Sequence, residues 1–294
     1  MSTYIDIIEV GPRDGLQREK TTISTDAKIH MIHQLVDAGI RTIQVTSFVH
    51  PKYVPQMADA EAVCQGIDKK PGVVYTGLVL NMKGLERAHD AGLTHVDMSV
   101  SASDSHSRKN ANRGLQEAMD GFGDMVRRAR EMGMQVRAGI QCAFGYYEPD
   151  VTQDLVLEIA EKQLALGVDS LSLADSTGMA NPRQIKAMLH ALNPLVGDVP
   201  VILHLHDTRG MGLANVLAAI EAGCTRFDTA FGGMGGCNFI PEALGNIPTE
   251  DTVNMLHEMG YETGVDVAKV AQVSRMLQTL IGQALPGKMY QLVG

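Results

Sequence analysis

The stretch VILHLHDTRGMGLANVLAAIEAGCTRFDTAF, residues 201–231, decides the fold that this sequence predicts. It opens on an apolar run, which predicts a buried strand from Val201 to His206. A helical stretch then closes at Gly223, because glycine suits the left-handed conformation just past a helix end. A second strand is predicted from Arg226 to Phe231. The stretch is therefore one strand, one helix and the start of the next strand.

The same unit recurs along the chain. The glycine helix ending is repeated at Ala38-Gly39-Ile40, Ala91-Gly92-Leu93, Met132-Gly133-Met134 and Leu166-Gly167-Val168. The predicted strands are Tyr4 to Val10, Thr42 to Ser47, Val73 to Leu80, His95 to Val100, Gln135 to Cys142, Ser170 to Ala174, Val201 to His206 and Arg226 to Phe231. Eight such units in about 230 residues indicate an α/β fold of the (β/α)8 TIM-barrel type. A doubly wound parallel sheet is the alternative.

The tail from Thr249 onward has no clear strand and two helical patterns, Glu250 to Met259 and Val265 to Leu280. It holds too few apolar positions for a core of its own. We therefore expect residues 1–294 to form a single domain with 249–294 as a C-terminal helical appendage that caps the barrel or mediates homo-oligomerisation, as a dimer or tetramer.

Composition narrows the class of protein. A formal net charge of −9 argues against nucleic-acid binding, so an acidic substrate would need a local basic patch. No stretch approaches the roughly 20 apolar residues that span a bilayer. The four cysteines lack paired spacing, which favours a reducing compartment. Since the first predicted strand begins at Tyr4 and leaves no room for a leader, we expect a cytoplasmic protein.

Two histidines close the seventh predicted strand. His204 and His206 are two residues apart on an extended strand, so both imidazoles project to the same face and could hold one metal ion. The alternative is that they simply line a polar end of the core. Because the active sites of such barrels lie at the C-terminal ends of the strands, the residues after the other strands decide between these interpretations.

Strand one is followed by the stretch GPRDGLQ, residues 11–17. Asp14 could bind a hard cation through its carboxylate, and Arg13 could stabilise an oxyanion or hold a carboxylate. The same residues would equally make a plain turn.

The eighth strand runs into a loop with four glycines in five positions before Cys237, whose thiol could transfer a proton. A flexible linker with a buried cysteine is the alternative. Further on, Asn246 could supply an amide oxygen to a cation or could cap a turn. Asp14, His204, His206 and Asn246 would together form a mixed nitrogen and oxygen set, which favours Mg²⁺ or Mn²⁺ ahead of Zn²⁺ or Co²⁺.

These motifs resemble those of the 3-hydroxy-3-methylglutaryl-CoA lyase family, within the metal-dependent TIM-barrel lyases and acyltransferases. The likeness runs from about Ile7 to about Asp266 with the motifs in the same order. They are Val10-Gly11-Pro12-Arg13-Asp14-Gly15-Leu16-Gln17, Thr46-Ser47-Phe48-Val49 with Pro51-Lys52, Val54-Pro55-Gln56-Met57, Ser101-Ala102-Ser103, His204-Leu205-His206-Asp207, Gly235-Gly236-Cys237 and Gly245-Asn246.

The resemblance implies cleavage of a 3-hydroxyacyl-CoA thioester to acetyl-CoA and a keto acid, with a divalent metal bound by Asp14, His204, His206 and Asn246. Arg13 and Cys237 are implied as catalytic residues, with Asp14 as one candidate base. Predicted substrate contacts are Gln17, Gln44, Ser47, Arg108 and Lys109, with Lys20 a weaker candidate. The segment around Arg108 and Lys109 could instead be a solvated helix start. Asp175 is expected to orient a ligand histidine.

Two departures from the family pattern bear on the substrate. The family has Glu-Ala-Thr-Ser-Phe after strand two, where this chain has Gln44, and it has a proline where this chain has Asn238. They motivate citramalyl-CoA, which would give acetyl-CoA and pyruvate, as an alternative to 3-hydroxy-3-methylglutaryl-CoA. A condensing acyltransferase is less favoured because such enzymes usually carry a long regulatory region. A catalytically silent barrel that binds CoA or a partner is the remaining alternative.

Overall fold

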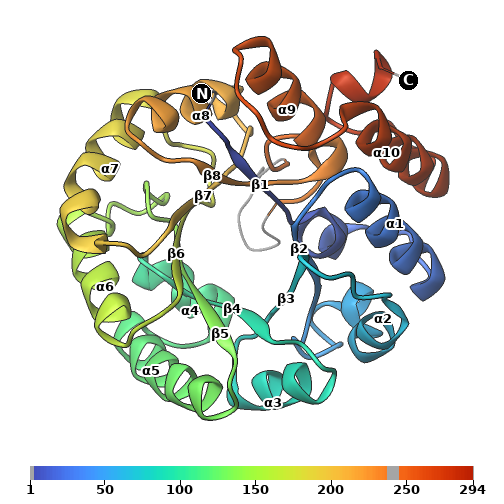
Figure 1. Ribbon diagram of the computed structural model, residues 1–294. Coiled ribbons are helices and arrows are strands. Elements are labelled where there is room, and N and C mark those ends of the chain that lie inside the picture. Colours follow the sequence, from blue (N-terminus) through green and yellow to red (C-terminus); the bar gives the residue numbers. More distant parts are fainter. Residues whose placement is uncertain (1–2, 237–244, 294) are drawn as a thin grey trace.

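A closed barrel of eight parallel strands forms the centre of the computed structural model, which describes residues 3–236 and 245–293 (Figure 1). The strands are β1 (Asp6–Glu9), β2 (Thr42–Ser47), β3 (Val74–Leu78), β4 (His95–Ser101), β5 (Gln135–Gln141), β6 (Ser170–Asp175), β7 (Val201–Leu205) and β8 (Arg226–Thr229). Each strand pairs with the next, and β8 pairs with β1. This closure confirms the predicted (β/α)8 barrel, because a doubly wound sheet would have two free edges.

Helices form a ring around the barrel (Figure 1). They are α1 (Thr25–Asp37), α2 (Ala60–Gly66), α3 (Met82–Asp90), α4 (Asp104–Ala111), α5 (Leu115–Glu131), α6 (Gln153–Ala165), α7 (Pro182–Val196), α8 (Gly212–Glu221), α9 (Thr249–Glu258) and α10 (Val267–Ile281). Short π or 3₁₀ turns occur at η1 (Gly11–Gly15), η2 (Leu16–Arg18), η3 (Pro55–Met57), η4 (Phe231–Gly233) and η5 (Met289–Gln291). No helix of the described residues is long and apolar enough to cross a membrane.

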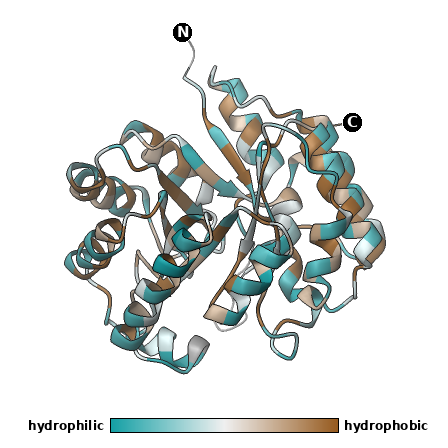
Figure 2. Ribbon diagram, turned by 60° about the horizontal axis from the view of Figure 1, so that its bottom comes forward, coloured by the Kyte–Doolittle hydropathy of each residue, from teal (hydrophilic) through white to brown (hydrophobic). Residues whose placement is uncertain are grey.

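The hydrophobic core lies between the strands and the ring of helices, where the apolar faces of both meet (Figure 2). Val253 of α9 and Val270 and Leu277 of α10 belong to the same core cluster as Ile32 and Leu35 of α1. Helix α10 contacts both α1 and α9. The two helices of the tail thus occupy the part of the outer ring that lies next to α1.

A buried glutamate at the end of β1 joins the turn after β1 to the turn after β8. Glu9 accepts hydrogen bonds from Gly11 N at 2.7 Å, Phe231 N at 3.1 Å and the Thr249 hydroxyl at 2.7 Å. Its side chain has no exposed surface. Burial raises the pKa of Glu9 to about 8, although the three donors oppose that shift. The carboxyl group therefore holds β1, η4 and the start of α9 together while it retains a proton.

We expect Glu9→Gln to become more stable than the wild type as the pH rises from about 5 to 8. An acid whose pKa is raised in the folded state contributes stability that is full below its unfolded pKa and is lost as the pH rises through the folded value. Glutamine cannot ionise and escapes this loss, which amounts to at most about 1.4 kcal/mol per pH unit. Urea unfolding at both pH values measures the difference. The exposed Glu258→Gln should show no such trend, and an equal trend in both variants would contradict the assignment.

Candidate metal centre and active site

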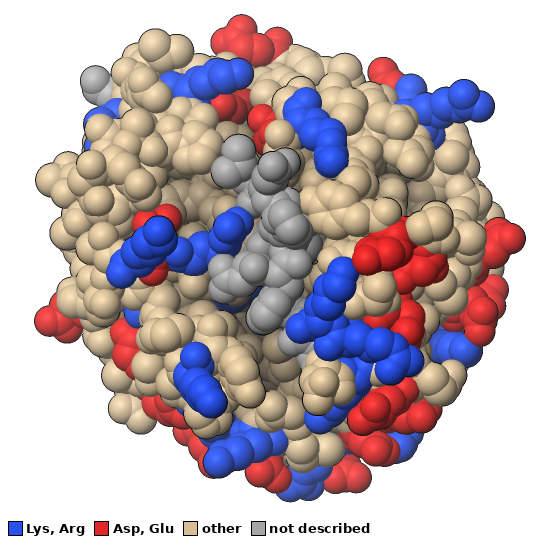
Figure 3. Space-filling view, turned by 180° about the vertical axis from the view of Figure 1, so that it is seen from behind, with Lys and Arg blue, Asp and Glu red and all other residues tan. Residues whose placement is uncertain are grey.

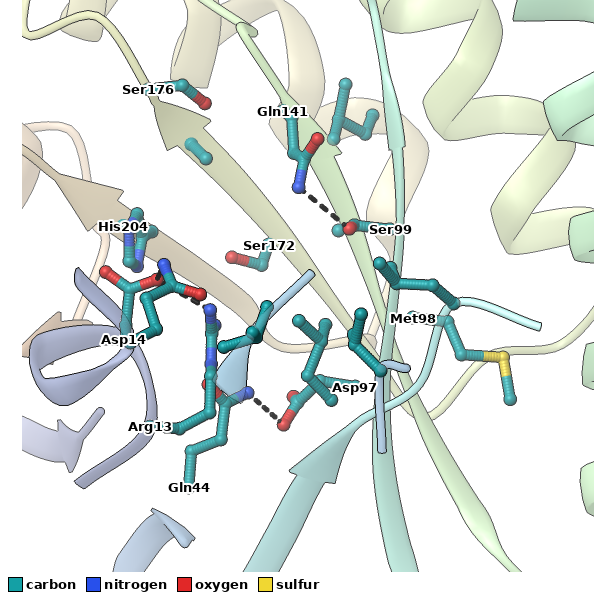
Figure 4. Close-up of a pocket in the computed structure, with 18 of the residues that line it drawn as sticks. Arg13, Asp14, Gln44, Asp97, Met98, Ser99, Gln141, Ser172, Ser176 and His204 are labelled. Atoms are coloured by element: carbon teal, nitrogen blue, oxygen red, sulfur yellow. Dashed lines mark hydrogen bonds and ion pairs between the residues drawn. The ribbon is translucent and has the colours of Figure 1, made fainter. Parts of the chain in front are cut away.

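The carboxyl ends of the strands surround a pocket of about 470 Å³. The turn η1 directly after β1 brings Arg13 and Asp14 to its wall, and the end of β7 brings His204 and His206. The structure thus brings these four predicted residues together at one end of the barrel. Figure 4 shows Asp14 and His204 side by side at this wall.

Three of the predicted ligands meet at one point. One ligand atom each from Asp14, His204 and His206 lies within 4.8 Å of the others, and the Nε2 atoms of the two histidines are 3.2 Å apart. Two nitrogens bound at about 2.1 Å to one ion, roughly at right angles, are separated by about 3 Å. The histidine pair thus has the spacing of two ligands of one cation.

Asn246 reaches the same point from a short segment that lies against the end of β7. Ile247 N donates to Leu205 O at 3.1 Å, and residue 246 forms an antiparallel bridge with His206. The Asn246 amide nitrogen donates to Asp14 Oδ2 and to Met234 O, each at 2.8 Å. Its buried Oδ1 accepts no hydrogen bond from any residue within 3–236 or 245–293. An unpaired buried oxygen beside a carboxylate and two imidazoles fits a divalent cation.

Gly235 allows this close approach. It has φ +116°, and a Cβ there would lie 2.3 Å from Asn246 Nδ2 and 3.0 Å from Asp14 Oδ2. Any side chain at this position would push Asn246 and Asp14 apart, so one of the glycines of the glycine-rich loop has a steric role.

The electrostatics suit metal ligands at neutral pH. Burial opposes ionisation of Asp14, but the Arg13 guanidinium, the two histidines and the Asn246 amide lower the pKa of its carboxyl group. Burial and the neighbouring His204 lower the pKa of His206 to about 4, although Asp14 opposes this shift. The site therefore presents an ionised carboxylate and a neutral imidazole, which are the forms that bind metals.

Asp228 of β8 orients the first histidine. Its Oδ2 lies 3.0 Å from His204 Nδ1, and the β7–β8 register places the two residues opposite each other. Asp175, the residue predicted for this task, instead accepts hydrogen bonds from the backbone of Met179 and Ala180 at 3.0 and 3.2 Å. Asp175 pairs with Leu205, between the two histidines, and it acts on His204 through its charge and not through a hydrogen bond.

A chain of polar side chains crosses the pocket from Arg13 to Asp228. Arg13 Nε donates to Gln44 Oε1, and Gln44 Nε2 donates to Asp97 Oδ2 (Figure 4). Arg137 of β5 then pairs with Asp97 at 3.5 Å and with Asp228. Asp97, Arg137 and Asp228 are not among the predicted site residues, although each is a charged residue inside a strand and lines the pocket. A charged residue inside a predicted strand is thus the sequence feature that could have identified them.

The remaining predicted substrate contacts divide into two groups. Gln17 lines the pocket and its amide donates to Asp14 Oδ1 at 3.0 Å, while Gln44 and Lys109 also line the pocket. Ser47, Arg108 and Lys20 are absent from its described wall. The buried Ser47 hydroxyl accepts from Val49 N at 3.3 Å, and Arg108 is exposed and paired with Asp104 at 2.7 Å. The predictions for Cys237 and Asn238 fall outside the described residues.

Basic side chains gather around the hollow at the centre of the face opposite to that of Figure 1 (Figure 3). Lys109 and Arg113 line the pocket, and Lys109 forms an ion pair with Glu148 at 3.0 Å. This is the local basic patch that an acidic chain needs to attract an anionic substrate.

The fold and the site together define a TIM barrel with a candidate cation site of carboxylate, amide and histidine side chains at the carboxyl ends of its strands. A family model described as HMGL-like matches residues 4–277, and the chain belongs to this family. It is an enzyme of the hydroxymethylglutaryl-CoA lyase type.

Individual relatives agree with the family. The chain is 40% identical to hydroxymethylglutaryl-CoA lyase of Bacillus subtilis, covering 98% of this chain and 97% of the relative. It is 39% identical to cytoplasmic 3-hydroxy-3-methylglutaryl-CoA lyase of Mus musculus, covering 98% and 84%. A structure of an HMG-CoA lyase from Acinetobacter baumannii in complex with coenzyme A and 3-methylmalate superposes with a TM-score of 0.94 at 40% identity, covering 98% and 94%.

We expect Asp228→Asn to weaken Mn²⁺ binding about 10–100-fold, the usual effect of removing the partner of a ligand histidine. Asp175→Asn is the matched control, since it makes the same change in an equally buried carboxyl group that accepts hydrogen bonds from backbone N–H groups and not from His204, and it should change the affinity less than about threefold. Calorimetric titration of both variants measures the affinities. Equal losses would show that Asp228 has no special role.

Proposed function

We propose that this protein cleaves 3-hydroxy-3-methylglutaryl-CoA to acetyl-CoA and acetoacetate with the help of a divalent metal ion. One observation carries the proposal: a cation site built from Asp14, His204, His206 and the unpaired Asn246 oxygen opens into the same pocket as Arg13. The names of relatives that share about 40% of their residues with this chain agree with this substrate.

The proposed cofactor is Mg²⁺ or Mn²⁺, bound by Asp14, His204, His206 and Asn246. The two oxygen ligands of this set, from Asp14 and Asn246, suit these hard cations. When bound, such an ion acidifies a substrate hydroxyl and fixes the substrate in place. The lowered pKa of Asp14 makes its carboxylate a better metal ligand than a general base. We therefore assign Asp14 to binding the metal and not to removing the proton of the substrate hydroxyl group.

Arg13 has the central part in the chemistry that we propose. When the 3-hydroxyl group gives its proton to solvent, its oxygen becomes the ketone of acetoacetate, the bond between C2 and C3 breaks, and the electron pair moves onto the thioester carbonyl as an enolate. Arg13 lines the pocket and is held by Asp14 at 2.6 Å and by Gln44, so its remaining N–H groups can stabilise that oxygen. Protonation of the enolate at C2 then gives acetyl-CoA. Cys237 is proposed as the acid, since Gly236 before it lines the pocket.

The CoA part of the substrate is proposed to lie over the basic residues of the rim. Lys109 and Arg113 could attract its phosphates, and the salt bridge of Lys109 with Glu148 is exposed and therefore easily rearranged. A cytoplasmic location and a homo-oligomeric state stay predictions.

A second candidate substrate is citramalyl-CoA, which carries a carboxylate on the carbon that bears the hydroxyl group. It is motivated by Gln44, which lines the pocket as a neutral amide where the family pattern has a glutamate, so that one negative charge is missing near the acyl end. The Acinetobacter baumannii relative was solved with coenzyme A and 3-methylmalate, a hydroxy acid of this kind.

We expect the purified protein to release acetyl-CoA and acetoacetate from 3-hydroxy-3-methylglutaryl-CoA with Mn²⁺ and to lose this activity with EDTA. His206→Ala should abolish metal-dependent turnover, because it removes one of the paired imidazoles. A coupled assay for each product, run in parallel with citramalyl-CoA, measures both candidates. Cleavage of citramalyl-CoA alone would exclude the first substrate in favour of the second.

Arg13→Met should lower kcat about 100-fold or more, since one preorganised donor at a developing oxyanion contributes about 3 kcal/mol. Arg108→Met is the control, because it removes an equal charge from an exposed side chain that does not line the pocket. It should change kcat less than about twofold. Steady-state kinetics of the two variants test the assignment, which fails if they lose activity alike.

A further inference from the structure

Gln44 is held by one hydrogen bond at each end of its amide. Its Oε1 accepts from Arg13 Nε, and its Nε2 donates to Asp97 Oδ2 (Figure 4). The residue is 2% exposed. Since a primary amide has an acceptor end and a donor end, only one of its two orientations makes both bonds. The opposite orientation would turn N–H groups toward the guanidinium.

Asp97 decides which orientation the amide takes. The Asp97 oxygen that accepts from Gln44 also accepts from the Thr76 hydroxyl, and its other oxygen lies 3.5 Å from Arg137 Nε. The charged groups around the pair are thus Arg13 from η1, Arg137 from β5 and, beyond it, Asp228. A fixed carboxylate at position 97 requires a donor from residue 44, which leaves the amide oxygen for Arg13.

Glutamate, which the family pattern has at this position, would not fit beside Asp97. Two carboxylates at hydrogen-bonding distance cannot both ionise, so one would have to keep a proton. With glutamine, Arg13 gains an acceptor that adds no negative charge beside it, and Asp14 is its only carboxylate partner among the residues described. The carboxylate next to residue 44 is then that of Asp97 on β4.

We propose that Asp97 is a positioning residue for Arg13 and acts through the amide of Gln44. The inference rests on the proposed role of Arg13 at the thioester carbonyl. It predicts that residues 44 and 97 are energetically coupled and that an amide and a carboxylate can be exchanged between them. In the exchanged pair, the amide now at position 97 would donate to the carboxylate now at position 44, and that carboxylate would accept from Arg13.

The test is a double-mutant cycle of Gln44→Glu and Asp97→Asn. Gln44→Glu should lower kcat at least about tenfold near neutral pH, with little change in KM. An effect of this size lies within the range of interaction energies between residues in contact. Its activity should fall as the pH rises, because loss of the shared proton sets two anions against each other. The double variant should recover most of kcat and lose this pH dependence. A kcat equal to the product of the two single effects would overturn the proposal.

A neutral variant keeps the test valid if Gln44→Glu folds poorly. Gln44→Met removes both hydrogen bonds without adding charge, so Asp97→Asn should lower kcat in the wild type but add nothing in this background. An equal effect of Asp97→Asn in both backgrounds would show that Asp97 does not act through residue 44.

The control is Gln116→Glu, where Gln116 donates to Asp120 at 2.9 Å on the exposed face of α5. This variant creates the same acid pair in water and should keep wild-type kcat.

Urea unfolding of the metal-free variants separates positioning from plain stability. Coupling in kcat together with coupling in the unfolding free energy supports the proposal. Coupling in unfolding alone would make Asp97 a structural residue and overturn the inference, while the lyase activity of the wild type would stand. Absence of thioester cleavage by the wild type would instead refute the proposed function.

Discussion

The structure depends on the way in which Arg137 is neutralised inside the barrel. A guanidinium that is largely withdrawn from water is tolerated only when carboxylates and hydrogen bonds replace that water. Arg137, whose side chain is 15% exposed, lies between Asp97 and Asp228 with Ser172 as a further acceptor at 3.1 Å. Each of these carboxylates has a second task, one at Gln44 and one at His204. The pairing of one arginine thereby sets the positions of Arg13 on one side of the pocket and of a ligand histidine on the other.

The barrel could be predicted from the sequence because its signals are local. Glycine past a helix end and a short apolar run after it need no knowledge of the rest of the chain. Asp14 and His206 could be predicted for a related reason, since each follows a strand closely, and barrel closure brings such residues together. The expected strand ends differ from the observed ones by at most two residues, as at β8, which ends at Thr229 because the chain turns into η4.

Residues inside the strands could not be chosen in the same way. Asp228 and Asp97 lie at inward positions, and the function of such a residue depends on which residue the neighbouring strand places opposite it. A sequence does not state that register. Asp175 was selected because it closes a strand, but its carboxylate satisfies the backbone of the following turn, which is a common use of aspartate at that position.

The proposed metal ligands Asp14 and Asn246 are hydrogen-bonded to each other although 232 positions separate them in the chain. Closing so long a loop costs entropy that no local contact returns. A nascent chain that has not yet reached Asn246 has no complete cation site. A cation that binds only the finished barrel would then raise the free energy of unfolding in proportion to the logarithm of its concentration. Supply of the ion would thus influence how much of this protein survives in the cell as well as how fast each molecule works.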